Sequence, residues 1–165
     1  MSNIVSANAL CLPNILAAIG EVGRRLCEIA ASEGAAGNIS CFGRWSENVE
    51  DFFSQSQPLE LPEPMPELAG GIVIATGSGR RLREIGQSPE ANLGAVRISD
   101  DGKAARLYTS PQKMFERLTS EFNSHLAVHR DCVGRENLNF HALVHAQPVH
   151  LTYLSHIDRY QNEKY

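Results

Sequence analysis

A regular stripe of apolar residues near the start of the sequence is the feature that most constrains the fold. Between residues 12 and 29, apolar side chains recur at steps of three and four, the spacing of one face of an amphipathic α-helix. Pro13 suits the first turn of such a helix, and Gly34 suits its end. The stripe consists of Leu12, Ile15, Leu16, Ile19, Val22, Leu26 and Ile29. We therefore predict a helix over 12–29 with one face against a hydrophobic core.

Beyond this helix, short apolar runs predict strands that are interleaved with further helices. The acidic, proline-rich segment 46–68 predicts a surface insertion without a regular helix. An Asp-Gly turn at 99–102 predicts a hairpin. This order predicts an α/β fold in which helices flank a central mixed or antiparallel sheet. We expect strands within 35–42, 71–75, 93–98, 103–108 and 140–146, and helices over 80–86, 118–133 and 149–157.

Composition limits the class of protein. The chain has 165 residues, 42% hydrophobic and 21% charged, which predicts one domain over 1–165. Its net charge of -4 argues against a nucleic-acid partner, because phosphate contacts normally require a basic surface. No run approaches the roughly 20 apolar residues of a membrane span, and no signal-peptide pattern is present, so a cytoplasmic location is expected. The four cysteines form no Cys-x-x-Cys pair, which favours free thiols.

A glycine loop follows the expected strand at 71–75. Gly77, Ser78 and Gly79 offer backbone N–H groups that can approach an anion without hindrance, at the start of an expected basic helix. Phosphate is the natural ligand of such a loop, with help from Arg80 and Arg81. The alternative is an ordinary turn between a strand and a helix. The spacing matches neither a Walker A loop nor a dinucleotide-binding loop, so nucleotide ligands are disfavoured.

A second polar cluster marks the start of the helix expected at 118–133. Thr119 and Ser120 can bind an anion there, and Glu121 can act as a base. The same residues also match a simple helix cap. Without other evidence, the cap is favoured over an anion site.

All six histidines lie in the last quarter of the sequence, where two sets compete as metal ligands. Residues i, i+4 and i+8 share one face of a helix, and residues i and i+2 share one face of a strand. Spacing alone does not choose between them. The helical set is Glu121, His125 and His129, and the strand set is His141, His145 and Gln147.

Five short motifs occur in one order along the chain. They are GNIS at 37–40, TGSG at 76–79, ANLG at 91–94, TSE at 119–121 and VHAQP at 144–148. Together they resemble the successive site motifs of the class II aldolase/adducin superfamily, over roughly residues 12–157. The TGSG, ANLG and TSE motifs are particularly similar to the branch of that superfamily that acts on rhamnulose 1-phosphate. The resemblance implies a three-layer fold and a homotetramer.

The resemblance also implies roles for individual residues. Glu121 is expected to be the catalytic acid/base, and His145 and position 147 to match the first two of three histidines that hold a zinc ion. His125 and His129 then become structural. The ion would polarise a carbonyl and stabilise an enediolate. The phosphate pocket is expected to contain Asn38, Gly77, Ser78, Gly79, Thr119 and Ser120.

Three departures from the family pattern weaken this expectation. Position 147 is Gln147, a neutral amide that zinc binds less readily than an imidazole. Ala35 and Ala36 replace an Asn-Gly pair beside Asn38. No residue matches the third histidine, so the chain is expected either to be truncated at its C-terminal end or to be a shorter variant that closes the site with His150 or His156.

These features lead to one leading hypothesis and two alternatives. The leading hypothesis is an enzyme, a divalent-metal-dependent aldehyde-lyase that cleaves a sugar 1-phosphate, rhamnulose 1-phosphate by resemblance, to dihydroxyacetone phosphate and an aldehyde. The cofactor is expected to be Zn²⁺ or another divalent ion. The first alternative is a non-catalytic binding domain like that of adducin. The second is a related epimerase or dehydratase.

Overall fold

The computed structural model describes residues 11–45 and 48–161, in which six antiparallel strands form one sheet of order β2-β5-β4-β3-β1-β6. The strands are β1 (Asn38–Gly43), β2 (Gln55–Leu59), β3 (Ile72–Thr76), β4 (Leu93–Ile98), β5 (Ala105–Thr109) and β6 (Phe140–His145). The expected α/β class is confirmed, and the sheet is antiparallel throughout. The hairpin predicted around 99–102 joins β4 to β5.

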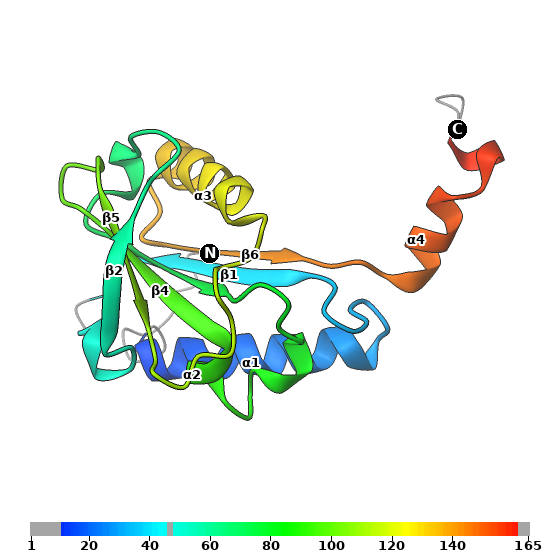
Figure 1. The fold of residues 1–165 in the computed structure, drawn as a ribbon. Coiled ribbons are helices and arrows are strands. Elements are labelled where there is room, and N and C mark those ends of the chain that lie inside the picture. Colours follow the sequence, from blue (N-terminus) through cyan, green and yellow to red (C-terminus); the bar gives the residue numbers. More distant parts are fainter. Residues whose placement is uncertain (1–10, 46–47, 162–165) are drawn as a thin grey trace, which may run out of the picture.

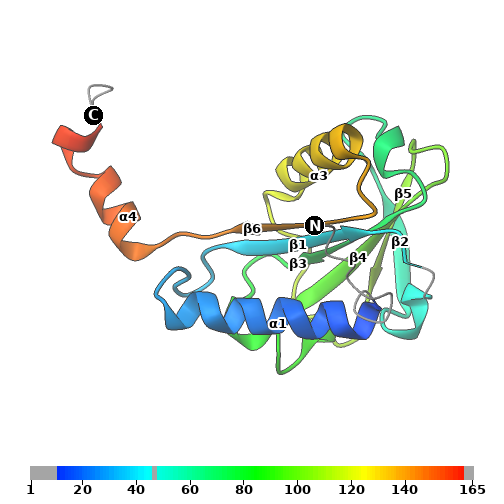
Figure 2. The same cartoon turned by 180° about the vertical axis from the view of Figure 1, so that it is seen from behind.

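Helices cover both faces of the sheet (Figures 1 and 2), which gives the three expected layers. The first helix, α1 (Leu12–Glu28), lies on one face, and α3 (Phe122–Glu136) lies on the other. The remaining helical segments are short. They are α2 (Pro89–Asn92), α4 (Val149–Ser155), and the 3-10 turns η2 (Val49–Asp51), η3 (Pro66–Leu68), η4 (Leu82–Glu84) and η5 (Asp158–Tyr160).

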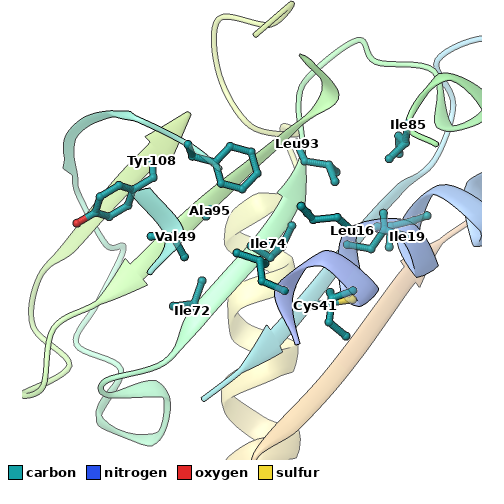
Figure 3. Close-up of a cluster of buried hydrophobic side chains, with 14 of the residues drawn as sticks. Leu16, Ile19, Cys41, Val49, Ile72, Ile74, Ile85, Leu93, Ala95 and Tyr108 are labelled. Carbon is teal, nitrogen blue, oxygen red and sulfur yellow. The ribbon is translucent and has the colours of Figure 1, made fainter. Parts of the chain in front are cut away.

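The sheet separates two clusters of buried hydrophobic residues. On the α1 face, Leu16 and Ile19 pack with Ile74 and Leu93 of the sheet (Figure 3). On the α3 face, Leu126 and other side chains of the helix pack against the opposite side of the same strands. Burial of apolar area on both faces is the main stabilising contribution to such a layered fold.

Two predicted elements are wrong. The segment 46–68, whose first two residues lie outside the described residues, contains the edge strand β2 rather than a surface insertion. Its sequence Gln-Ser-Gln-Pro-Leu is polar because the strand is largely exposed, and Pro58 is tolerated at the edge of a sheet. The basic segment 80–86 forms only the single turn η4, so no α-helix N-terminus follows the glycine loop.

The C-terminal part of the described chain stands apart from this body. Figures 1 and 2 show α4 beyond the end of β6, away from the two helices that cover the sheet, and none of its residues is buried. Within the described ranges, no helix combines the length and the apolar character that crossing a membrane requires.

Candidate functional site

One polar cavity of about 260 Å³ lies where β1 begins and where β3 and β6 end. All nine residues that the sequence predicted for the site line this cavity. They are Asn38, Gly77, Ser78, Gly79, Thr119, Ser120, Glu121, His145 and Gln147. Their proximity is a structural finding, whereas the individual roles stay predictions.

Strand pairing explains how such distant segments meet. Asn38 of β1 lies opposite His145 of β6 in the antiparallel register, and β3 is the other neighbour of β1. Gly77 follows β3 and forms an isolated bridge with Leu118, which brings the start of α3 to the same edge. Glu121 is the N-cap residue of α3. The pairing of β1 with β3 and β6, together with this bridge, therefore brings the lining residues of the cavity together.

Three polar side chains meet at the centre of the cavity. The Glu121 Oε2 atom lies 2.5 Å from Nδ1 of His145 and accepts a hydrogen bond of 3.1 Å from Nδ2 of Asn38. The same amide nitrogen lies 3.4 Å from the His145 ring. The hydrogen bond from Asn38, with a further contribution from His145, lowers the pKa of Glu121 below its usual value. Glu121 is thus a carboxylate at neutral pH and can accept a proton.

The other end of the Asn38 amide is unsatisfied. Asn38 is 7% exposed, and its Oδ1 atom is buried without a hydrogen-bond partner among the described residues. Such an orphaned acceptor costs roughly 1–3 kcal/mol unless a ligand supplies a donor or a cation. The cavity therefore contains one acceptor that fits a substrate hydroxyl group or a metal ion.

The glycine loop differs from the expected cradle of three backbone amides. The N–H of Gly77 donates to the Asn92 carbonyl oxygen at 2.8 Å, and that of Ser78 donates to the Arg117 carbonyl oxygen at 2.8 Å. The Gly79 N–H and the Ser78 hydroxyl form no hydrogen bond to any of the described residues. The expectation of three free amides is therefore corrected. Two of the three N–H groups hydrogen-bond to neighbouring segments, and only the Gly79 N–H and the Ser78 hydroxyl are available to an anion.

Arg80 adds further hydrogen bonds between the glycine loop and its neighbours. Its guanidinium donates to Oδ1 of Asn92 at 2.8 Å and to Oε2 of Glu84 at 2.9 Å. Asn92, which is 2% exposed, also donates to the Ser88 carbonyl oxygen. Asn92 thus links the TGSG and ANLG segments, a role that the sequence reasoning missed. The only sign of this role in the sequence was that Asn92 belongs to the ANLG motif.

The start of α3 is not closed by a side-chain cap. Glu121 occupies the N-cap position, and its side chain forms no capping hydrogen bond. Thr119 accepts a weak bond of 3.4 Å from the Glu121 N–H, and its own N–H donates to the Thr76 carbonyl oxygen. Ser120 lines the cavity, and neither its N–H nor its hydroxyl is bonded within the described part of the chain. Ser120 is therefore the better placed of the two hydroxyl residues to bind an anion.

The helical histidines do not line the cavity. His125 and His129 are buried on the sheet-facing side of α3, where both contact the Ser40 hydroxyl, at 2.6 and 2.7 Å. His129 also lies 2.7 Å from His141 of β6. Burial lowers the pKa of His125, and burial together with His141 lowers the pKa of His129 to about 3. These imidazoles are neutral and join α3 to β1 and β6.

Comparison with known families decides how this arrangement is classified. The family described as "Class II Aldolase and Adducin N-terminal domain" matches residues 17–164. The chain belongs to this family. That result confirms the resemblance seen in the five ordered motifs.

Individual members of the class II aldolase and adducin family support the assignment. Rhamnulose-1-phosphate aldolases from Yersinia pestis (strain Pestoides F) and Yersinia pseudotuberculosis serotype O:3 are each 31% identical to this chain over 136 residues. The match covers 78% of this chain and 48% of each relative, so the chain spans about half the length of these curated relatives. A sugar-phosphate aldolase structure from Thermotoga maritima shares the fold, with a TM-score of 0.67, 24% identity, and coverage of 91% and 60% of the two chains.

A divalent metal ion is expected for class II aldolases, but the described side chains do not complete a zinc site. Within residues 11–45 and 48–161, no group of three or more His, Cys, Asp or Glu side chains is arranged to hold a metal ion. His145 and Glu121 bond to each other, and Gln147 adds a neutral amide. Zinc sites normally use three or four nitrogen, sulfur or carboxylate ligands. The donor set fits a divalent ion only in part.

Proposed function

We propose that this chain forms the substrate-binding and acid–base part of an aldolase that cleaves a phosphorylated sugar. The observation that carries the proposal is the convergence of the nine predicted site residues on one polar cavity around the Glu121–His145 pair. Rhamnulose 1-phosphate is the proposed substrate, by similarity to the Yersinia aldolases. The products would be dihydroxyacetone phosphate and an aldehyde.

The substrate phosphate is assigned to the side of the cavity formed by the glycine loop and the start of α3. The unbonded N–H groups of Gly79 and Ser120 and the hydroxyl groups of Ser78 and Ser120 supply the donors. Several hydrogen bonds to an anionic group are each stronger than bonds between neutral partners. The buried Asn38 Oδ1 can accept a hydrogen bond from a sugar hydroxyl group.

Glu121 is assigned the transfer of a proton during carbon–carbon bond cleavage. Its lowered pKa keeps it ionised at neutral pH, so it can take a proton from the substrate and return it to a carbon atom of the product. His145 and Asn38 both contact the Oε2 atom and thereby fix the carboxylate in the cavity. A positioned acid/base group of this kind contributes about 100-fold or more to a reaction rate.

The metal ion of the proposed enzyme remains a prediction for the whole protein. A divalent ion would supply positive charge for a developing enediolate. The described residues that would hold it, His145 and Gln147, would fill its coordination shell only in part. The single domain over 1–165 and the cytoplasmic location rest on composition and sequence pattern, whereas the homotetramer rests on the resemblance. All three stay predictions.

A direct assay tests the proposed function. The purified protein is incubated with rhamnulose 1-phosphate at several concentrations of Zn²⁺, Co²⁺ or Mn²⁺, and dihydroxyacetone phosphate is measured by a coupled reduction. We expect product formation that the Glu121→Gln substitution removes. Absence of product with every ion would contradict the proposal. Formation of an isomeric sugar phosphate or a dehydrated product would favour the epimerase or dehydratase alternative.

The incomplete ligand set favours a second candidate, a non-catalytic binding domain like that of adducin. In this case the fold and the anion site are kept without catalysis. Metal analysis separates the two candidates, because about one tightly held divalent ion per chain is expected for the enzyme and none for the binding domain.

A further inference from the structure

A second cavity, of about 340 Å³, lies between strands β2, β4 and β5. Its lining includes Pro58, Arg97, Ala104, Ala105, Arg106 and Tyr108. Pockets for small ligands typically start at about 300 Å³ and combine apolar walls with a few polar groups. This cavity has both features, and none of the residues assigned to the aldolase site lines it.

Two arginines face one another in this cavity without a counter-charge. Arg97 of β4 and Arg106 of β5 are directly opposite in the antiparallel register, and both side chains line the cavity. Like charges at opposed positions are destabilising. In the described part of the chain neither guanidinium forms an ion pair, and Arg106 donates only a 3.3 Å bond to the Ser56 hydroxyl. An anion between them would remove the repulsion.

Tyr108 adds a hydrogen-bond donor to the lining of this cavity. It follows Arg106 on the same face of β5 and is 7% exposed. Its hydroxyl group has no hydrogen-bond partner among the described residues and, unlike Asn38 Oδ1, is not a buried unsatisfied atom, so it is open to solvent at the cavity. Figure 3 shows the ring at the margin of the α1-side cluster, with the oxygen pointing away from the other labelled side chains. The hydroxyl is free to donate to a bound group.

The carboxylate of Asp101, in the turn that joins β4 to β5, pairs with neither arginine. Asp101 accepts a hydrogen bond of 2.6 Å from Ser99, which also lines the cavity, and one of 3.0 Å from the Lys103 N–H. The Ser99 hydroxyl in turn accepts from the Ala104 N–H. The side chains of Asp101 and Ser99 thus form hydrogen bonds within the β4–β5 turn.

The second cavity is separate from the aldolase site. Arg97 pairs with Ile72 at the first residue of β3, whereas Gly77 follows the last residue of that strand. Five strand residues span about 15 Å, so one anion cannot contact both groups of residues. Binding at the two cavities can therefore be measured independently.

We propose that this cavity binds a small organic anion, with its phosphate or carboxylate group between Arg97 and Arg106. The Tyr108 hydroxyl donates to the same group, and the apolar part of the ligand lies against Pro58 and Ala105. Arginine is suited to this task because its planar guanidinium presents paired donors to an oxyanion. The site is independent of the proposed aldolase function.

The test follows backbone amide signals by NMR during titration of the whole chain with four probes. Phenyl phosphate combines an oxyanion with an apolar ring, inorganic phosphate lacks the ring, and phenol lacks the charge. We expect phenyl phosphate to shift the amides of β4 and β5 and to bind at least about fivefold more tightly than inorganic phosphate. Benzoate, titrated in parallel, distinguishes a carboxylate ligand from a phosphate ligand by their relative affinities.

Substitutions complete the test. Arg97→Gln and Arg106→Gln should each weaken phenyl phosphate binding by about tenfold, and Tyr108→Phe by about threefold. Arg25→Gln, which removes an exposed charge of α1 outside the cavity, should leave it unchanged. Shifts confined to Gly79 and Ser120, equal binding of phenol, or equal weakening by Arg25→Gln would overturn the proposal. The first of these outcomes would leave the aldolase proposal intact.

Discussion

The imidazole of His145 lies 2.5 Å from the carboxylate of Glu121, measured from Nδ1 to Oε2, although 24 positions separate the two residues in the sequence. His145 is the last residue of the edge strand β6, and Glu121 is the N-cap residue of α3. Their contact is available only because β6 pairs with β1 while the start of α3 is bridged to Gly77. The pair therefore depends on the completed sheet.

Replacement of this carboxylate provides the most direct prediction. Glu121→Gln keeps an oxygen that can accept from Asn38 but removes the base. We expect aldol cleavage to fall at least about 100-fold, while the unfolding midpoint and phosphate affinity change little. Glu90→Gln, an exposed substitution outside the cavity, is the matched control and should keep full activity. Retention of activity in Glu121→Gln would remove Glu121 from the mechanism.

The glycine loop allows a comparison of two neighbouring alanine substitutions. A Cβ atom at Gly77 would lie 2.3 Å from ring carbons of Phe115, whereas nothing lies within 4 Å of one at Gly79. Gly79 instead has a φ of +72°, which disfavours any side chain. We expect Gly79→Ala to cost about 1 kcal/mol of unfolding free energy and Gly77→Ala about 1–3 kcal/mol. Urea denaturation measures both, and a larger loss at Gly79 would show that the loop differs from the structure.

Local sequence patterns predicted most of the fold. The apolar period of α1 and the buried runs of β3 and β4 are strong because these elements face a core, and the structure confirms them. The strand β2 was missed because an edge strand exposed on both sides lacks the apolar pattern that identifies interior strands. The helix predicted over 80–86 was too long, since only the single turn 82–84 forms.

The site was predicted from motifs rather than from physical pattern. Spacing left two sets of histidines open, and only the family resemblance favoured His145 over His125 and His129. The buried hydrogen bonds of His125 and His129 to Ser40 now give a structural reason for their presence. The amide donors of Gly77 and Ser78 were assigned wrongly, because their partners Asn92 and Arg117 become neighbours only after the chain folds.

The amide at position 147 offers a test of the metal prediction. Gln147→His would place a second imidazole beside His145 in the cavity, and zinc binds imidazole nitrogen more strongly than a neutral amide oxygen. We expect zinc affinity, measured by isothermal titration calorimetry, to rise at least about tenfold. Gln87→His adds an exposed histidine elsewhere and should not change it. An equal rise in both variants would indicate adventitious binding and contradict a metal site at His145.

The buried imidazole of His129 predicts a loss of stability in acid. His129 is fully buried, and the groups that face it are His125 on its own helix, Ser40 and Phe42 of β1, and His141 of β6. Its pKa is lowered to about 3, against roughly 6.5 in an unfolded chain. The stabilising contribution is complete above pH 6.5 and is lost as the pH falls toward 3, because the unfolded chain binds a proton that the folded chain excludes.

From this difference, we expect His129 to remove about 2 kcal/mol of unfolding free energy between pH 7.5 and pH 5. The comparison uses urea denaturation of the unmodified chain and of His129→Gln, whose unfolding free energy should depend less on pH by that amount even though the variant is less stable overall. His156→Gln removes an exposed histidine and should keep the full dependence. The same pH dependence in all three proteins would show that His129 is not excluded from protonation, and the hydrogen-bonded link between α3 and the sheet would then need a different description.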